Sequence, residues 1–231
     1  MLLAPAGGAD GDSSMTVALF DLDNTLLGGD SDYLWGEFLV DVGAVEAEEH
    51  RRKNERFLAQ YQDGTLDIDS FLSFQLEPLS NYDVATLRAW RERFVAELIA
   101  PLVLAKGRAL IEDHRRRGHW LAIATSTNAF ITRPIADLLG VEHLLATEPE
   151  FNGERYTGRY LGEPCSGAGK VQWVNEWASR LGLDLADSWF YSDSHQDLPL
   201  LTLVDHPVAV DPDDRLRQHA RAHGWPIVSL R

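Results

Sequence analysis

Strands and helices alternate through the second half of the chain, and this alternation constrains the fold most. Short apolar runs predict the strands, and stretches with helical spacing of apolar residues predict the helices between them. The predicted strands are residues 120–124, 143–147, 189–192, 207–210 and 226–230, and the predicted helices are residues 129–139, 168–181, 197–204 and 213–223. This order indicates an α/β fold with a doubly wound parallel sheet. A hairpin is expected over residues 151–161, with Gly153 at its turn.

One more predicted strand lies far upstream and is followed by helices alone. Residues 16–22 contain a continuous apolar run that is typical of a buried parallel strand. The helices expected after it are residues 33–42, 44–61, 68–76, 84–100 and 103–117. An all-helical insert at this point predicts a cap over the carboxyl edge of the sheet. We therefore expect a catalytic core of residues 15–32 and 118–231, a helical cap of residues 33–117, and a disordered segment of residues 1–14.

The chain is strongly acidic, which argues against several kinds of partner. Its 231 residues include 36 Asp and Glu against 21 Lys and Arg, and the formal net charge is −15. This field repels nucleic acid and anionic lipid, so we expect neither nucleic acid nor a membrane as a partner. A single cysteine, Cys165, excludes an intramolecular disulfide. We expect a cytoplasmic protein, because no apolar run spans a bilayer and no signal peptide precedes Met15, a candidate natural start.

Polar residues follow three of the predicted strands at the edge where open α/β sheets bind ligands. Asp21 and Asp23 come at the end of the first strand, and Thr125 ends the strand at residues 120–124. Asp193 directly follows the strand at residues 189–192. The carboxyl ends of parallel strands share one edge, so these side chains are expected to converge there.

Each of these groups suits a step of phosphoryl transfer. The carboxylate of Asp21 can attack phosphorus and form an acyl phosphate. Asp23 can protonate the leaving oxygen and then deprotonate water, provided that the chain bends at Leu22 to bring both acids to one site. Thr125 and Lys170, which lies near a predicted helix start, can hold the phosphoryl oxygens. Clustered carboxylates repel one another, and Mg²⁺ with oxygen ligands relieves that repulsion.

Four segments in this order resemble the motifs of the haloacid dehalogenase superfamily of phosphatases. Residues 20–26, FDLDNTL, match its first motif, an aspartate pair in a D-x-D-x-T frame after an apolar strand. Residues 123–125 match the second motif, Lys170 matches the third, and residues 191–197, YSDSHQD, match the fourth. The resemblance covers residues 16–230, and the helical insert is similar to the cap of the phosphoserine phosphatase-like branch.

The resemblance implies a role for each matched residue. Asp21 would be the nucleophile, and Asp23 would be the general acid and base. Asp21, the backbone carbonyl of Asp23, and Asp193 would bind Mg²⁺. Asp197 would orient Lys170 or a metal-bound water. The implied activity is hydrolysis of a small phosphorylated metabolite through an aspartyl-phosphate.

The fourth motif departs from the G-D-G-x-N-D pattern that is usual in that branch. Ser192 and Ser194 replace its glycines, and Gln196 stands where Asn is usual. This departure puts in doubt the outer metal-water contacts that the Asn makes. Three arginines of the cap could reach a substrate: Arg51, Arg52 and Arg56.

The sequence also suggests what the substrate carries beside its phosphate. Asp30 lies nine residues after the nucleophile, where phosphoserine phosphatases place an acid that binds the substrate amine, and Asp30 or Asp32 could fill that role. The alternative is that these acids cap the helix that follows them. Ser126, Asn128 and His195 are further candidates for substrate contact. Histidinol phosphate and phosphoserine, which both carry an ammonium group, are the expected substrates.

Three other functions share parts of this pattern. A signalling receiver module uses Asp, Thr, Lys and Mg²⁺, but it lacks a helical cap and its acidic pair usually precedes the phosphorylated Asp. A silent domain could bind phosphorylated metabolites without turnover. A phosphotransferase would share the aspartyl-phosphate and pass the phosphoryl group to an alcohol. The sequence leaves the oligomeric state open.

Overall fold

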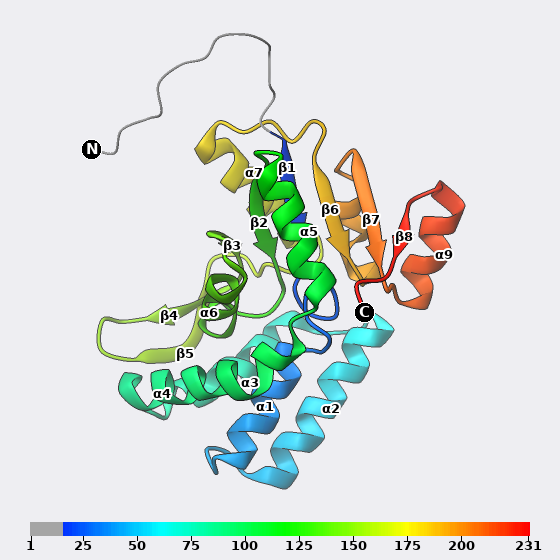
Figure 1. The fold of residues 1–231 in the computed structure, drawn as a ribbon. Coiled ribbons are helices and arrows are strands. Elements are labelled where there is room, and N and C mark those ends of the chain that lie inside the picture. The colour runs from blue at the N-terminus through cyan, green and yellow to red at the C-terminus, as the bar shows by residue number, and fades with distance from the viewer. Residues whose placement is uncertain (1–15) are drawn as a thin grey trace, which may run out of the picture.

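A six-stranded parallel sheet forms the centre of the protein (Figure 1). The computed structural model describes residues 16–231, so the expectation for residues 1–14 and for Met15 lies outside the described residues. The strand order is β3-β2-β1-β6-β7-β8, with β1 and β6 as neighbours. The strands are β1 (Val17–Phe20), β2 (Trp120–Ala124), β3 (His143–Leu145), β6 (Trp189–Ser192), β7 (His206–Val210) and β8 (Ile227–Val228). The predicted doubly wound parallel sheet is confirmed.

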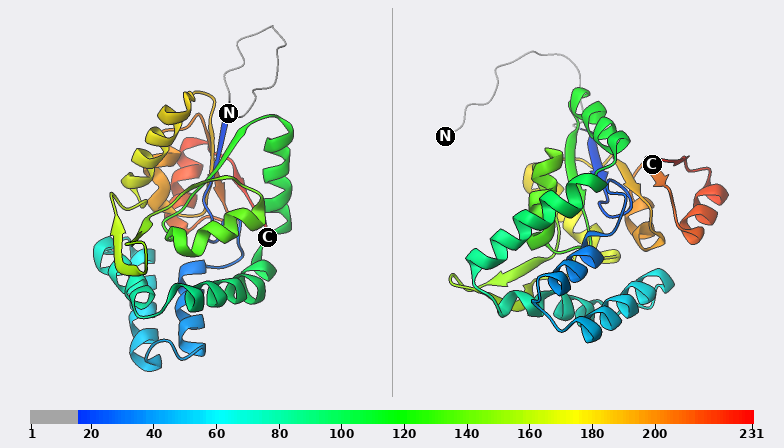
Figure 2. Two further views of the ribbon diagram at one scale, coloured as in Figure 1. Left: turned by 90° about the vertical axis from the view of Figure 1, so that its left-hand side faces the viewer. Right: turned by 60° about the horizontal axis from the view of Figure 1, so that its bottom comes forward.

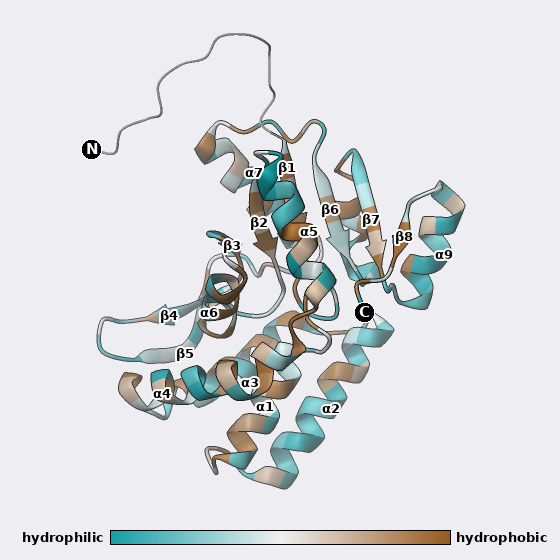
Figure 3. Ribbon diagram, in the orientation of Figure 1, coloured by the Kyte–Doolittle hydropathy of each residue, from teal (hydrophilic) through white to brown (hydrophobic). Residues whose placement is uncertain are grey.

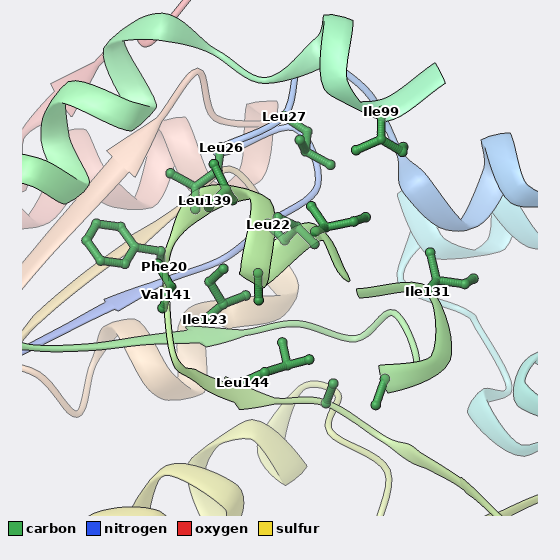
Figure 4. Close-up of a cluster of buried hydrophobic side chains, with 14 of the residues drawn as sticks. Phe20, Leu22, Leu26, Leu27, Ile99, Ile123, Ile131, Leu139, Val141 and Leu144 are labelled. Atoms are coloured by element: carbon green, nitrogen blue, oxygen red, sulfur yellow. The ribbon is translucent and has the colours of Figure 1, made fainter. Parts of the chain in front are cut away.

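Helices cover both faces of this sheet (Figure 2). Alternate residues of β1 enter different clusters of buried side chains, because successive side chains of a strand point to opposite faces. Ala18 and Phe20 pack with one cluster, which includes residues of α5 (Ala105–Arg116) and α6 (Ala129–Leu139). Figure 4 shows Phe20 and Ile123 of this cluster.

The opposite cluster contains the other two residues of β1, Val17 and Leu19. It includes residues of α7 (Ala168–Leu181), α8 (Leu198–Leu201) and α9 (Asp214–His223). The central strand is therefore buried on both sides, and this explains why it reads as a continuous apolar run.

A second layer of helices lies beyond the carboxyl edge of the sheet (Figure 1). It consists of α1 (Ser31–Asp41), α2 (Ala47–Asp63), α3 (Ile68–Ser80) and α4 (Val84–Phe94). The antiparallel hairpin of β4 (Glu148–Phe151) and β5 (Tyr156–Leu161) extends from the core and packs along α3. Figure 3 shows that α2 is polar along most of its length, whereas apolar residues concentrate in β2 and α6.

Helix α5 lies with the sheet, although the sequence suggested that it belongs to the cap. Ile111 of α5 is buried in the cluster that contains Phe20, and His114 Nε2 lies 2.8 Å from the hydroxyl of Tyr191 in β6. Gly107 of α5 approaches Leu26, where an added Cβ would lie 3.3 Å from the leucine side chain. We propose that the cap ends at about residue 102 and that α5 belongs to the core.

Two helices differ in extent from the prediction for identifiable reasons. The helix expected over residues 84–100 ends at Phe94 and continues as a π-helical turn, Val95–Ile99, and a 3₁₀ turn, Ala100–Leu102. Pro101 has no N–H and its ring disfavours a regular α-helix over the preceding turn. The helix α1 begins at Ser31, two residues early, because the side chain of Asp30 accepts a hydrogen bond from the Tyr33 N–H and caps it.

Four further elements are shorter or shifted. The strand expected over residues 143–147 ends at Leu145. The hairpin expected from residue 151 starts at residue 148, and Gly153 lies in its turn, as predicted, with a φ of 98°. The helix expected from residue 197 begins with a 3₁₀ turn, His195–Asp197, before α8. The last predicted strand shrinks to the two residues of β8. Within residues 16–231, no helix combines the length and the apolar character needed to span a membrane.

Candidate active site

Lys170 links two carboxylates at the carboxyl edge of the sheet. Its Nζ lies 2.8 Å from Asp21 Oδ1 and 2.8 Å from Asp197 Oδ1. Lys170 is only 1% exposed, and the two acids are also buried. Ser192 donates a further hydrogen bond to Asp197. The buried ammonium is therefore compensated by two carboxylates and held in one orientation by them.

Asp193 joins this group through the hydroxyl of Thr25. Thr25 Oγ1 lies 3.3 Å from Asp21 Oδ2 and 3.3 Å from Asp193 Oδ1, and it accepts a hydrogen bond from the Asp193 N–H. Asp21 follows β1 and Asp193 follows β6, which are adjacent strands whose connections run to opposite sides. This is the topological switch point, where open α/β sheets bind ligands.

Asp23 is brought to the same edge by a sharp turn after β1. Asn24 adopts a left-handed conformation with a φ of 57°, which asparagine tolerates better than most residues. The carboxylate of Asp23 accepts hydrogen bonds from the Ser31 N–H at 2.6 Å and from Thr127 Oγ1 at 2.8 Å. The expected bend is present, and a hydroxyl and a backbone amide hold Asp23 in place.

Thr125 and Ser126 lie on the wall of the same cavity as Asp21 and Asp23. Thr125 Oγ1 accepts a hydrogen bond from the Thr127 N–H, and Ser126 Oγ lies 3.3 Å from Ser166 Oγ. In this loop, the hydroxyl of Thr127 contacts a carboxylate that follows β1, that of Asp23.

Two predicted contacts are not among the residues that line the cavity. Asn128 is 1% exposed and precedes α6. His195 Nδ1 lies 2.7 Å from Asp213 Oδ2, and its Nε2 lies 3.1 Å from Arg215 Nη1. The two ring nitrogens of His195 are thus engaged by the core, which leaves them no free position toward a substrate.

The structure distinguishes Asp30 from Asp32, although both line the cavity. Asp30 caps α1, as its hydrogen bond at 2.8 Å from the Tyr33 N–H shows. Asp32 is 6% exposed, and its Oδ1 has no hydrogen-bond partner among the described residues. A buried carboxylate oxygen without a partner is costly, so Asp32 is the better candidate for a cationic ligand.

The cap supplies cavity residues that sequence reasoning did not single out. They come mainly from α2 and α3: Asn54, Phe57, Leu58, Tyr61, Ile68, Phe71 and Gln75. The loop after β2 adds Thr127, which lies two residues beyond the second motif. Helical spacing on α2 could have indicated a shared face for Asn54, Leu58 and Tyr61, but it could not show which way that face turns.

Burial and mutual repulsion raise the pKa values of the acids of the site. Burial raises the pKa of Asp21 to about 7, against the opposing effect of Lys170. Burial also raises the pKa of Asp23 to about 6, with the Asp30 carboxylate adding to the shift. The pKa of Asp193 is raised well above its usual range by burial and by Asp21. Burial alone would lower the pKa of Lys170, but Asp197 and Asp21 raise it.

The donor set fits a hard divalent cation. Among residues 16–231, no group of three or more His, Cys, Asp and Glu side chains is placed to hold a metal. Mg²⁺ commonly takes only one or two carboxylates and keeps water as its other ligands. Asp21 and Asp193 provide two such carboxylates beside one another, and a cation between them would reverse the upward shift of their pKa values.

Comparison with known proteins agrees with this geometry. Residues 18–202 match the family of haloacid dehalogenase-like hydrolases. The chain is 41% identical over 219 residues to a histidinol-phosphatase of Neisseria meningitidis. This alignment covers 93% of this chain and 99% of the relative. It is 33% identical over 242 residues to a phosphoserine phosphatase of Mycobacterium tuberculosis, covering 99% of this chain and 77% of the relative.

Solved structures show the same fold. A Bordetella pertussis protein of unknown function superimposes with a TM-score of 0.89 at 41% identity, covering 95% of this chain and 100% of that protein. A substrate-bound phosphoserine phosphatase gives a TM-score of 0.70 at 16% identity, covering 95% of each chain. The family match spans most of the chain, and the fold agrees with it. This protein therefore belongs to the haloacid dehalogenase-like hydrolases.

Proposed function

We propose that this chain is a Mg²⁺-dependent phosphatase that hydrolyses a small phosphate monoester through an aspartyl-phosphate on Asp21. The observation that carries this proposal is the convergence of Asp21, Asp23, Thr125 and Asp193 on one cavity under the helical cap. Its curated relatives include proteins named as phosphatases, which supports the same reaction class.

The first step forms one bond and breaks another. An oxygen of the Asp21 carboxylate attacks phosphorus, and the bond from phosphorus to the ester oxygen breaks. Asp23 donates its proton to the leaving alcohol. A pKa of about 6 suits this role, because both protonation states are accessible near neutral pH.

The second step regenerates the enzyme. Asp23, now a carboxylate, takes a proton from a water molecule as that water attacks the phosphorus of the aspartyl-phosphate. The bond from phosphorus to the Asp21 oxygen breaks, which restores the Asp21 carboxylate and releases inorganic phosphate. Lys170 and Thr125 stabilise the negative charge on the phosphoryl oxygens. Mg²⁺ held by Asp21, the carbonyl of Asp23 and Asp193 would supply further positive charge at this position.

The substrate carries a cationic amine beside its phosphate ester. Asp32, with its unpartnered Oδ1, faces the cavity and would pair with an ammonium group. We therefore rank histidinol phosphate and phosphoserine above sugar phosphates and nucleotides. These two are also the substrate classes in the names of the curated relatives.

Acid quenching with radiolabelled substrate tests the mechanism. The wild-type enzyme should retain label on the protein, and the label should be lost on treatment with hydroxylamine, which cleaves acyl phosphates. Asp21→Asn protein should retain none. Label that persists in Asp21→Asn, or phosphate release without any trapped intermediate under single-turnover conditions, would argue against an aspartyl-phosphate at this residue.

A further inference from the structure

Gln75 is a buried polar group in an otherwise apolar part of the cavity. It lies on α3, is 2% exposed, and lines the cavity together with Phe57, Ile68 and Phe71. Its Nε2 has no hydrogen-bond partner among the described residues. Leaving a buried amide N–H unsatisfied is costly, so a bound ligand that accepts a hydrogen bond there would be favoured.

The cavity wall offers no free positive charge to a ligand carboxylate. Among the described residues that line it, none is Lys, Arg or His. Neither Arg51 nor Arg56 of the cap is among the lining residues, although Arg56 lies against one of them, Phe57. Arg51 Nε lies 2.9 Å from Glu37 Oε2, and the Arg56 guanidinium lies 4.9 Å from the centre of the Phe57 ring.

The cavity is also lined by several acids, which makes a ligand carboxylate still less favourable. Four of its lining residues other than Asp21 are aspartates: Asp23, Asp30, Asp32 and Asp193. Lys170 is not among the lining residues and is already paired with Asp21 and Asp197. A carboxylate on the substrate would lose its hydration and meet like charges, with no cationic side chain in the described wall to pair with it.

Resting on the proposed function, we propose that the cap holds a subsite for an uncharged ring. The preferred substrate is then a phosphate ester of an amino alcohol that has no carboxylate and carries a neutral nitrogen heterocycle. The ammonium pairs with Asp32, the ring lies among Phe57, Ile68 and Phe71, and a ring nitrogen accepts a hydrogen bond from Gln75 Nε2. Planar rings suit such a wall, because aromatic side chains favour stacked and edge contacts with them.

Three amine-bearing esters separate the parts of this proposal. Phosphoethanolamine has the amine alone, phosphoserine adds a carboxylate, and histidinol phosphate adds an imidazole instead. At pH 8, where the free imidazole is mainly neutral, kcat/KM should rank histidinol phosphate first, phosphoethanolamine second and phosphoserine last. A value for phosphoserine equal to or above that for phosphoethanolamine would overturn the proposal.

Gln75→Leu tests the ring contact directly. It should lower kcat/KM for histidinol phosphate by about tenfold or more, because discrimination by a buried hydrogen bond is lost. The values for phosphoethanolamine and phosphoserine, which carry no ring, should fall far less. Gln172→Leu, a matched change at an exposed position on α7, should alter none of them. An equal loss on all three substrates in Gln75→Leu would mean that Gln75 only supports the cap, and would overturn its role as a ring contact.

Calorimetry separates failure of the subsite from failure of the proposed function. If no ester is hydrolysed, including p-nitrophenyl phosphate, the phosphatase proposal fails. Tighter binding of histidinol phosphate than of phosphoserine, lost in Gln75→Leu, would still support the subsite. If hydrolysis proceeds but phosphoserine both binds and reacts best, the subsite is wrong and the phosphatase proposal stands.

Discussion

At the scale of single residues, Asp21 is buried and held by contacts to both of its carboxylate oxygens. Lys170 lies 2.8 Å from one of its oxygens, and Thr25 lies 3.3 Å from the other. Burial raises its pKa to about 7. A carboxylate held in this way is poorly solvated and correctly oriented, which are the properties of an activated nucleophile.

Asp21→Asn should abolish turnover while leaving the fold intact. The amide is nearly isosteric with the carboxylate but is a very poor nucleophile, so we expect kcat to fall at least about 10³-fold, or about 4 kcal/mol. Steady-state phosphate release measures the loss of turnover, and the circular dichroism spectrum checks that the fold is intact. Asp137→Asn, an exposed aspartate on α6, is the matched control. Near wild-type turnover by pure Asp21→Asn protein would contradict the assignment of Asp21 as the nucleophile.

Activity should require Mg²⁺, and Ca²⁺ should support it poorly. Asp21 would be both a metal ligand and the nucleophile, so its free oxygen must remain aimed at phosphorus. Ca²⁺ is larger and accepts both oxygens of one carboxylate, which would misdirect that attack. The measurement is phosphate release after chelation and after adding back each ion. Equal rates with the two ions, or full activity after exhaustive chelation, would contradict this prediction.

At the scale of elements, the C-terminal end of α2 is bonded to the fourth motif. Tyr61 donates a hydrogen bond through its hydroxyl to Ser194 Oγ at 3.1 Å, and its carbonyl accepts one from Gln196 Nε2 at 2.7 Å. Arg215 of α9 donates to the carbonyl of Asp63. Ser194 and Gln196 are two of the positions at which the motif departs from the usual pattern of its branch. Their side chains here connect the core to the cap.

Gln196→Leu should loosen the cap. Loss of one hydrogen bond, worth about 1 kcal/mol, shifts an opening equilibrium about fivefold. Hydrogen exchange at the backbone amides of residues 58–65 should therefore accelerate, and kcat/KM should fall by a similar factor, since a closed cap excludes water from the reaction. Gln172→Leu is again the control. Unchanged exchange over residues 58–65 would show that this contact does not hold the cap.

At the scale of the whole molecule, β1 connects the stability of the core to the site. It lies between β2 and β6, and all four of its residues are completely buried. The strand leads directly into Asp21, so packing on both faces of the sheet determines where this proposed nucleophile lies.

Leu19→Ala should destabilise the protein by about 2–5 kcal/mol, because it removes a large side chain from a packed interior and leaves a cavity. Urea unfolding followed by tryptophan fluorescence gives the free energy of unfolding. Leu161→Ala, at a side chain that is 51% exposed, should change it by no more than about 0.5 kcal/mol. Similar losses in the two variants would mean that burial of β1 is not a main source of stability.

The sequence by itself determined the core fold and the acids that follow its strands. Residues 17–20 and 120–124 are continuous apolar runs, and the parallel topology predicts that Asp21, Asp23, Thr125 and Asp193 share one edge. These inferences are reliable because periodicity and strand ends are local properties of the chain. The extent of short elements was less accessible, since one proline or one side-chain cap moves a boundary by several residues.

Only the tertiary structure decided how the cap completes the cavity. Tyr61 and Gln75 reach the site because α2 and α3 pack over the sheet edge in one particular orientation, and Thr127 reaches it from the loop after β2. The separate environments of Asp30 and Asp32 have the same origin, since two acids two residues apart on the chain differ only in what surrounds them. Contacts between segments far apart in sequence depend on the packing of whole helices, and no local pattern of residues encodes that packing.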